Sequence, residues 1–122
     1  MSFNKDLGNK GEEMAQEFLK NKGFEILETN WTYQRAEVDI IVQQANLLIF
    51  VEVKTRSTDY FGRPEEAVHQ KKQKLLAKAA DAYLKINELE QEVRFDIIAI
   101  IHNKTKTLIR HIEEAFFPFE TY

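Results

Sequence analysis

The sequence contains no cysteine, and only four of its 122 residues are glycine and two are proline. The absence of cysteine excludes disulfide scaffolds, thiolate zinc sites and cysteine nucleophiles together, and it fits a reducing compartment. No stretch approaches the roughly 20 apolar residues of a membrane-spanning helix. Residues 1–6 contain no apolar segment of the signal-peptide kind. We therefore expect a cytoplasmic protein that has no membrane partner.

Internal repeats, low-complexity tracts and linkers are also absent from the sequence. The length and the apolar fraction of 43% predict one globular domain over residues 1–122, whose tail, residues 113–122, either packs on the core or is mobile. The net charge of −3 is unlike that of proteins that coat nucleic acid. It leaves nucleases open, because their sites are acidic and a bound metal reverses the local field.

Apolar periodicity predicts two helices and five strands. The helices cover about residues 5–22 and 65–86, and the strands cover residues 24–30, 35–43, 47–54, 93–101 and 107–112. A loop is expected over residues 55–64. The first three strands can form an antiparallel meander, and the second helix can return the chain so that the fourth strand runs parallel to the third. The expected fold class is α/β, with a mixed central sheet of about five strands flanked by helices.

Charged side chains occur within two of these predicted strands, where most other residues are apolar. Glu52 and Lys54 end the most hydrophobic strand, and the alternation of side chains places both on one face. Asp39 lies between Val38 and Ile40 in the preceding strand. Burial of such groups is unfavourable unless they are paired or bind a metal. If the two strands pair, Asp39 and Glu52 converge, and oxygen ligands of this kind suit Mg²⁺ or Mn²⁺.

Spacing alone leaves plainer interpretations open for each of these charges. A Glu–Lys pair at the end of a strand is usually solvated or mutually paired. Glu12, which follows Gly11 on the first helix, could supply a further carboxylate or simply be favoured there by the helix dipole. We interpret Asp96, in the fourth strand, as a partner of Arg94 or of a helix lysine, and the three histidines show no metal-ligand spacing.

A wider pattern surrounds these residues. Its segments are Gly8-Asn9-Lys10-Gly11-Glu12, Ala15, Phe18-Leu19, Gly23-Phe24, Asn30-Trp31, Glu37-Val38-Asp39, Phe50-Val51-Glu52-Val53-Lys54-Thr55-Arg56, Phe61-Gly62, Ala67-Val68, Lys72 and Arg94-Phe95-Asp96. Asp39 followed by Glu52-Val53-Lys54 resembles the PD-(D/E)XK motif of the restriction-endonuclease-like superfamily. The whole pattern resembles the bacterial YraN-like family of predicted endonucleases, and it is also similar to archaeal Holliday-junction resolvases.

The resemblance implies a restriction-endonuclease-like fold and a role for each matched position. Asp39 and Glu52 would be ligands of Mg²⁺ or Mn²⁺, together with the Val53 carbonyl. Lys54 would position or activate the attacking water and stabilise developing charge. Glu12 would complete the acidic site, as the helix glutamate does in the resolvases.

The resemblance also implies a DNA substrate. Lys72 would contact phosphate and Arg56 would face the DNA backbone. Branched or structured DNA is expected from the likeness to resolvases, and a two-fold symmetric junction would call for a homodimer. The family usually has glycine where this chain has Ala36. The competing hypothesis is a non-catalytic DNA-binding or repair-adaptor module on the same fold, and a third is a structural protein whose strand charges form ordinary ion pairs.

Overall fold

The computed structural model describes residues 3–58 and 68–117. Within these ranges the helices are α1 (Phe3–Asn21) and α2 (Gln70–Ile86). The strands are β1 (Glu25–Tyr33), β2 (Ala36–Gln44), β3 (Leu47–Arg56), β4 (Glu92–His102) and β5 (Thr107–Ile112). No described helix is both long and apolar enough to cross a membrane.

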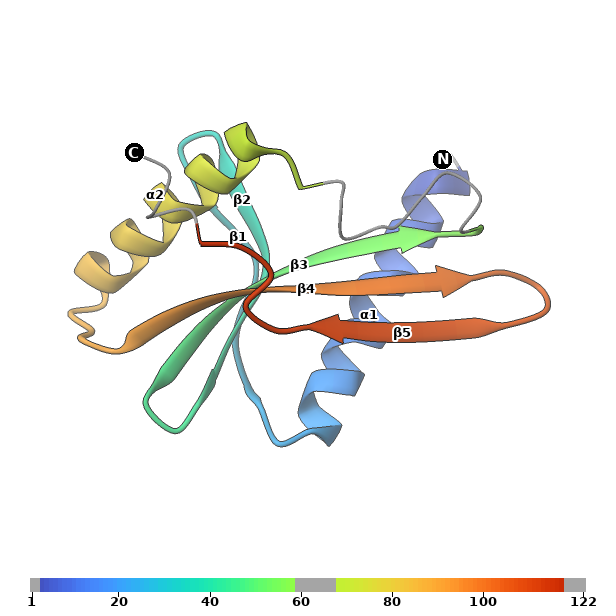
Figure 1. The fold of residues 1–122 in the computed structure, drawn as a ribbon, viewed down its shortest axis with the longest axis horizontal. Helices are drawn as coiled ribbons and strands as arrows, with labels where there is room; N and C mark the ends of the chain where they lie inside the picture. Colours follow the sequence, from blue (N-terminus) through green and yellow to red (C-terminus); the bar gives the residue numbers. More distant parts are fainter. Residues whose placement is uncertain (1–2, 59–67, 118–122) are drawn as a thin grey trace.

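One five-stranded mixed sheet organises the chain, in the order β1-β2-β3-β4-β5 (Figure 1). The strands β1, β2 and β3 form an antiparallel meander, β4 runs parallel to β3, and β5 returns antiparallel to β4. The connection through α2 makes the parallel pair possible, because a tight turn cannot join parallel neighbours. The predicted α/β fold with a mixed sheet is therefore confirmed.

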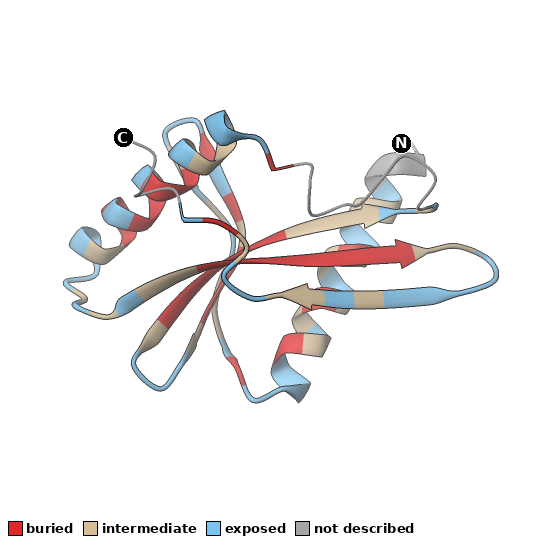
Figure 2. Ribbon diagram, viewed as in Figure 1, coloured by how far each residue is buried: buried red, intermediate tan, exposed pale blue. Residues whose placement is uncertain are grey.

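The two helices pack against different hydrophobic clusters of the sheet. Alternate residues of β3 supply both clusters: Leu48 and Phe50 join the cluster that contains α2, whereas Ile49 and Val51 join the cluster that contains α1. A strand covered on both faces reads as a continuous apolar run, as this one does. Figure 2 shows the resulting band of buried residues through the centre of the sheet. Glu52 follows Leu48 and Phe50 on the face of β3 that is covered by α2, so a carboxylate lies in line with buried apolar side chains.

The start of α2 differs from the prediction. Residues 68 and 69 are not helical, and the helix begins at Gln70 with His69 as its N-cap, so the predicted start near residue 65 is wrong for the described part. Residues 65–67, most of the predicted loop (59–64) and residues 118–122 of the tail lie outside the described ranges. His69 makes no capping hydrogen bond, so no side-chain cap marks the start of this helix in the sequence.

Other element boundaries agree with the sequence within a few residues. Helix α1 ends before Gly23, whose φ of +90° is the left-handed conformation that commonly stops a helix. Strand β3 continues two residues beyond the predicted end, to Arg56. In the described part of the tail, Phe116 is buried and stacks on Phe95 with ring centroids 5.3 Å apart, so this part packs on the core.

Candidate active site

The cleft of interest forms where β2 and β3 separate. Their antiparallel pairing reaches Ile40 opposite Val51, whereas β3 continues its parallel pairing with β4 as far as Arg56 opposite Ile101. Beyond the Ile40–Val51 pair, the Val53 amide donates a hydrogen bond to Asp39 Oδ2 at 2.8 Å. Past the last backbone pair, the Asp39 carboxylate thus takes the place of a backbone carbonyl as acceptor for β3, and the space between β2 and β3 opens beside it.

This opening is a cleft of about 550 Å³. The residues that line it come from the start of α1, from β2 and from the end of β3: Leu7, Gly8, Glu12, Asp39, Glu52, Val53, Lys54, Thr55, Arg56, Ser57 and Thr58. The structure therefore brings together Glu12, Asp39, Glu52 and Lys54, which are far apart in the sequence. These are the four residues predicted to be catalytic.

Glu52 lies at the buried end of the cleft, with 3% of its surface exposed. Its Oε1 atom accepts a hydrogen bond from Lys72 Nζ at 2.6 Å, and Lys54 Nζ lies 3.8 Å from the same atom. Its other oxygen, Oε2, is buried and has no hydrogen-bond partner among the described residues. An ionised carboxylate in such a place is unfavourable unless a cation balances it.

Asp39 and Glu12 share this environment. Burial, the neighbouring charges of Glu52 and Glu12, and a side-chain hydrogen bond with Glu52 raise the pKa of Asp39 to about 8, although the hydrogen bond from the Val53 amide acts in the opposite direction. Burial, followed by the charges of Glu37 and Glu52, raises the pKa of Glu12. Within the described part of the chain, Glu12 Oε1 is a second buried oxygen that accepts no hydrogen bond. The three carboxyl groups repel one another, which is the arrangement that a bound cation stabilises.

The two lysines of the cleft differ in their surroundings. Burial and the nearby charge of Lys72 lower the pKa of Lys54, although Glu52 and Asp39 oppose the shift. Burial would also lower the pKa of Lys72, but the hydrogen bond to Glu52 and the carboxylate charges outweigh it, so that pKa is raised. Lys72 is therefore held as a cation on Glu52, whereas the Lys54 amine gives up its proton more readily.

The structure places both predicted DNA contacts, Lys72 and Arg56, at the cleft. Lys72, expected at a phosphate, is engaged by Glu52 at the floor of the site. Arg56 is exposed at the edge of the cleft, where its guanidinium donates to the Thr55 carbonyl at 3.0 Å. Sequence reasoning missed the Lys72–Glu52 pair, because only the packing of α2 on the sheet brings the two together.

Gly11 explains how α1 comes close enough to supply Glu12. A Cβ atom at Gly11 would overlap the Thr55 hydroxyl and lie 2.9 Å from Thr55 Cβ. Any side chain at this position would push α1 away from the end of β3. The absence of a side chain therefore sets the distance between the helix that carries Glu12 and the strand that carries Glu52.

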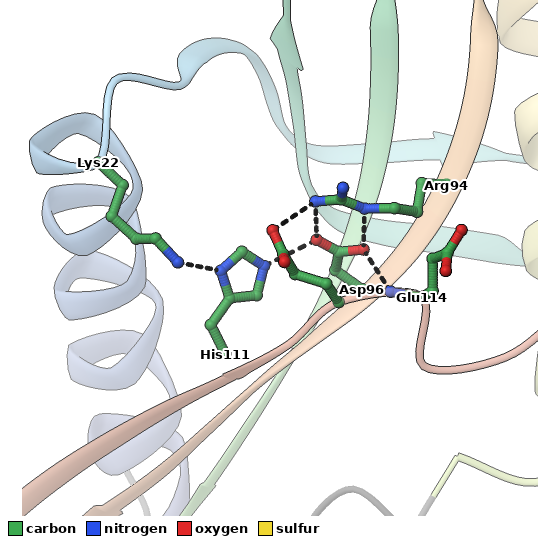
Figure 3. A network of polar contacts seen from close by, with 6 residues as sticks. Lys22, Arg94, Asp96, His111 and Glu114 are labelled. Carbon is green, nitrogen blue, oxygen red and sulfur yellow. Dashed lines mark hydrogen bonds and ion pairs between the residues drawn. The ribbon is translucent and has the colours of Figure 1, made fainter.

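A second polar cluster surrounds Asp96, which is fully buried in β4 (Figure 3). Arg94 donates two hydrogen bonds to its carboxylate, at 2.8 and 2.9 Å, so the predicted pairing with Arg94 is confirmed. His111 Nε2 lies 2.7 Å from Asp96 Oδ2, and Lys22 Nζ lies 2.9 Å from the other ring nitrogen. The pairing of β5 with β4 brings His111 to Asp96, and sequence spacing gave no signal of it.

This second cluster, and not the trio of Glu12, Asp39 and Glu52, is where three potential metal ligands lie close together among the described residues. One ligand atom from each of Asp96, His111 and Glu113 lies within 4.8 Å of the others, so the group could hold a metal ion. Both oxygens of Asp96 are already occupied by hydrogen bonds, and Arg94 also contacts Glu113 at 3.0 Å. The guanidinium supplies the positive charge here, and the cluster differs from the cleft because neither oxygen of Asp96 lacks a partner, whereas Glu52 Oε2 has none among the described residues.

The chain was compared with known proteins. Residues 11–100 match the profile of a family described as "Uncharacterised protein family UPF0102". A UPF0102 protein of Christiangramia forsetii is 55% identical over 119 residues, covering 98% of this chain and 100% of that protein. One from Flavobacterium psychrophilum is 50% identical over the same shares of both chains. One from Thermodesulfovibrio yellowstonii is 44% identical, covering 92% of this chain and 96% of that protein. These matches confirm the resemblance to the YraN-like family.

Proposed function

Because this chain belongs to the uncharacterised family UPF0102, we propose its function from the site itself: it is a metal-dependent endonuclease that hydrolyses phosphodiester bonds in DNA. The cleft that contains Asp39, Glu52 and Lys54 is its active site. The combination of acidic residues and a lysine on two adjoining strands is that of the PD-(D/E)XK motif, which the sequence resembles.

The observation that carries the proposal is the pair of buried carboxylate oxygens, Glu12 Oε1 and Glu52 Oε2, for which the described residues provide no hydrogen-bond donor. Buried polar atoms in folded proteins almost always have partners, so two such atoms in one cleft need an explanation. The raised pKa of Asp39 beside them comes from its burial and from the neighbouring carboxyl groups of Glu52 and Glu12. A divalent cation would balance all three groups.

The donor set fits a hard cation. Asp39 and Glu52, with the Val53 carbonyl, offer only oxygen ligands, and Glu12 adds another carboxylate nearby. Oxygen-only sites of this kind suit Mg²⁺ or Mn²⁺. Such an ion, when bound, would polarise the scissile phosphate and favour ionisation of a water molecule.

The remaining chemistry belongs to the side chains of the cleft. Lys54, whose amine lies 3.8 Å from Glu52 Oε1, would orient the attacking water and stabilise the charge that develops on the phosphate. Lys72 would act as a positioning residue: by binding Oε1 of Glu52, it leaves Oε2 directed to the ion. DNA, and branched DNA in particular, is proposed from the resemblance to the resolvases, and so is a homodimer for two-fold symmetric junctions.

The proposal is tested by metal binding and by cleavage. The purified protein is titrated with Mn²⁺ in a thermal-shift assay, and is then incubated with four-way junctions, flaps, single strands and linear duplex in Mn²⁺ or EDTA. We expect Mn²⁺ to raise Tm and to support cleavage, and we expect Glu52→Gln to abolish both. Glu17→Gln, the same chemical change at an exposed position on α1, is the control. Cleavage that persists in Glu52→Gln, or in EDTA, refutes the assignment.

One observation favours the non-catalytic DNA-binding module instead. Lys72 already neutralises Glu52 at 2.6 Å, so half of this carboxylate is satisfied without a metal. The module predicts that DNA binds with equal affinity with and without Mn²⁺, that Tm does not respond to the metal, and that no substrate is cut. The structural interpretation predicts neither metal binding nor DNA binding.

A further inference from the structure

Exposed basic residues lie on two sides of the acidic cleft. On one side are Lys10 of α1 with Lys104 and Lys106 of the β4–β5 turn, which we call the hairpin surface. On the other side are Arg35 of the β1–β2 turn and Lys71 of α2, which we call the helix surface. In Figure 1 the β4–β5 turn lies at the right edge of the molecule, whereas the start of α2 and the β1–β2 turn lie at the upper left.

The hairpin surface adjoins the cleft directly. A hollow lined by Lys10, Lys104 and His102 shares Leu7 and Ser57 with the cleft. Asp6 is the acidic residue of this hollow, so its lining has a net charge of +1 with histidine neutral: two lysines against one aspartate.

One side chain, that of Asn103, ties the β4–β5 turn to the edge of the cleft. Asn103 Nδ2 donates to the Ser57 carbonyl at 2.7 Å, which fixes the turn to the residue that follows β3 at the edge of the cleft. Asn103 Oδ1 accepts hydrogen bonds from the backbone amides of Thr105 and Lys106, at 2.9 and 3.0 Å. The turn that carries two exposed lysines is therefore ordered and oriented before any ligand binds, which lowers the entropic cost of binding.

The helix surface reaches the cleft through Lys72. A hollow of about 460 Å³ is lined by three cations, Arg35, Lys71 and Lys72, and by one acidic residue, Glu37. Lys72 in turn contacts Glu52 inside the cleft. The first turn of α2 contains no acidic residue. Lysines at the start of a helix are disfavoured by the helix dipole, so helix stability does not explain their presence. They add positive charge where the hollow opens to solvent.

We propose that the two surfaces bind the phosphates of one nucleic-acid strand that crosses the cleft, entering over the hairpin surface and leaving over the helix surface. The placement of the scissile phosphate in the cleft rests on the proposed function. The strand then continues on both sides of the cut, so the site acts inside a polynucleotide and not at its end.

Charge complementarity is the reason for choosing a polyanion of this form. The exposed cations are separated by a cleft whose own titratable side chains are Glu12, Asp39, Glu52, Lys54 and Arg56, three carboxyl groups against two cations, so the cleft adds no net positive charge. A polyanion is therefore attracted on both sides of the cleft and not at its centre until a cation enters. Regularly spaced phosphates can meet both basic surfaces at once, as phosphate contacts position a strand without reading its sequence.

The test measures binding in EDTA, where no metal-dependent cleavage can occur. A fluorescein-labelled DNA duplex is titrated by anisotropy with the wild-type protein and with two double variants, Lys104→Ala/Lys106→Ala and Arg35→Ala/Lys71→Ala. Each variant is expected to raise Kd on the order of tenfold and to lower the slope of log Kd against log salt by about 2, because two phosphates are no longer neutralised. Lys20→Ala/Lys85→Ala removes the same charge from exposed, ion-paired positions and should change Kd less than about twofold.

A third variant separates geometry from charge. Asn103→Ala keeps every lysine but releases the turn, so we expect weaker binding with a nearly unchanged folded circular-dichroism spectrum. Equal losses of affinity in the control and the two double variants would overturn the proposal, because they would indicate unspecific attraction. A loss of affinity confined to one surface would place a strand end in the cleft and overturn the crossing strand. Poly-glutamate competing as well as DNA would indicate an acidic protein partner instead.

The failure of this inference can be told from the failure of the nuclease proposal. A protein that binds DNA through both surfaces but never cuts it in Mn²⁺ retains the binding inference and loses the nuclease. A protein that cuts in Mn²⁺, with both double variants binding and cutting like the wild type, retains the nuclease and loses the binding inference. Absence of binding to any oligonucleotide overturns the inference outright.

Discussion

Replacing Gly11 with alanine tests whether the close approach of α1 to β3 fixes the site. The added methyl would overlap the Thr55 hydroxyl and lie 2.9 Å from Thr55 Cβ and 3.0 Å from its Cγ2. Overpacking of this kind costs about 1–3 kcal/mol, whereas glycine to alanine within a helix contributes about 1 kcal/mol of stability. Because Thr55 belongs to a strand paired along its length with β4, it cannot move aside easily. We expect a net decrease of up to about 2 kcal/mol in the free energy of unfolding, measured by urea denaturation.

Gly8 provides the matched control on the same helix. Among the described residues, nothing lies within 4 Å of a Cβ built there, so Gly8→Ala should stabilise the protein by about 0.5–1 kcal/mol. The double variant Gly11→Ala/Thr55→Ala, which removes two of the three clashing atoms, should be less destabilised than the sum of its single variants. If Gly11→Ala is as stable as Gly8→Ala, the close packing of α1 does not position Glu12, and this part of the reasoning fails.

Three further predictions concern buried polar groups. Burial alone would raise the pKa of Asp96, but hydrogen bonds from its histidine and arginine partners outweigh it and lower the pKa. The stability that Asp96 contributes is present above its unfolded pKa of about 3.9 and is lost as pH falls through the folded pKa. Asp96→Asn should therefore lower the free energy of unfolding by about 3–5 kcal/mol at pH 7, measured by urea denaturation. The variant should also lose less stability than the wild type when the pH is lowered. Lys72→Met should destabilise the metal-free protein by about 1–3 kcal/mol, because Glu52 loses its nearest cation, and Mn²⁺ should then raise Tm more than in the wild type by scanning fluorimetry. Burial and the nearby Glu28 raise the pKa of Tyr83 to about 12, so its phenolate should appear last in a titration at 295 nm, and Tyr83→Phe should remove that step and cost about 1 kcal/mol.

The strand arrangement could be predicted because the order of apolar and polar residues in each strand indicates which of its faces are buried. Strand β3 is apolar on both faces and proved central, and the carboxylates that interrupt β2 and β3 already mark the cleft in the sequence. The prediction that Asp39 and Glu52 converge assumed simple pairing of the two strands. The two strands do pair, as far as Ile40 and Val51, the neighbours of Asp39 and Glu52, and just beyond this pair Asp39 accepts the hydrogen bond of the Val53 amide. The alternation of side chains in the sequence does not show where the pairing of β2 with β3 ends.

Contacts between distant elements could not be predicted. The placement of Lys72 on Glu52 depends on how α2 crosses the sheet, and the placement of His111 on Asp96 depends on the register of β5. Strand register is decided by turn geometry and by the burial of one face of the strand. A single charged residue such as Lys72 or His111 indicates neither the register of β5 nor the path of α2. The local signal at Asp96 identified only the partner two residues away, Arg94.

Two buried carboxylates of the sheet differ in their hydrogen bonding, which separates a carboxylate with a structural role from one in the candidate active site. Asp96 and Glu52 lie on neighbouring parallel strands and are almost equally buried. Both oxygens of Asp96 are hydrogen-bonded, whereas one oxygen of Glu52 has no donor in the described part of the protein, although lysines lie nearby. The same sheet is therefore able to satisfy a buried carboxylate fully when the carboxylate only holds strands together. Since a half-satisfied buried charge destabilises the fold, the open oxygen of Glu52 supports the proposal that a cation binds there.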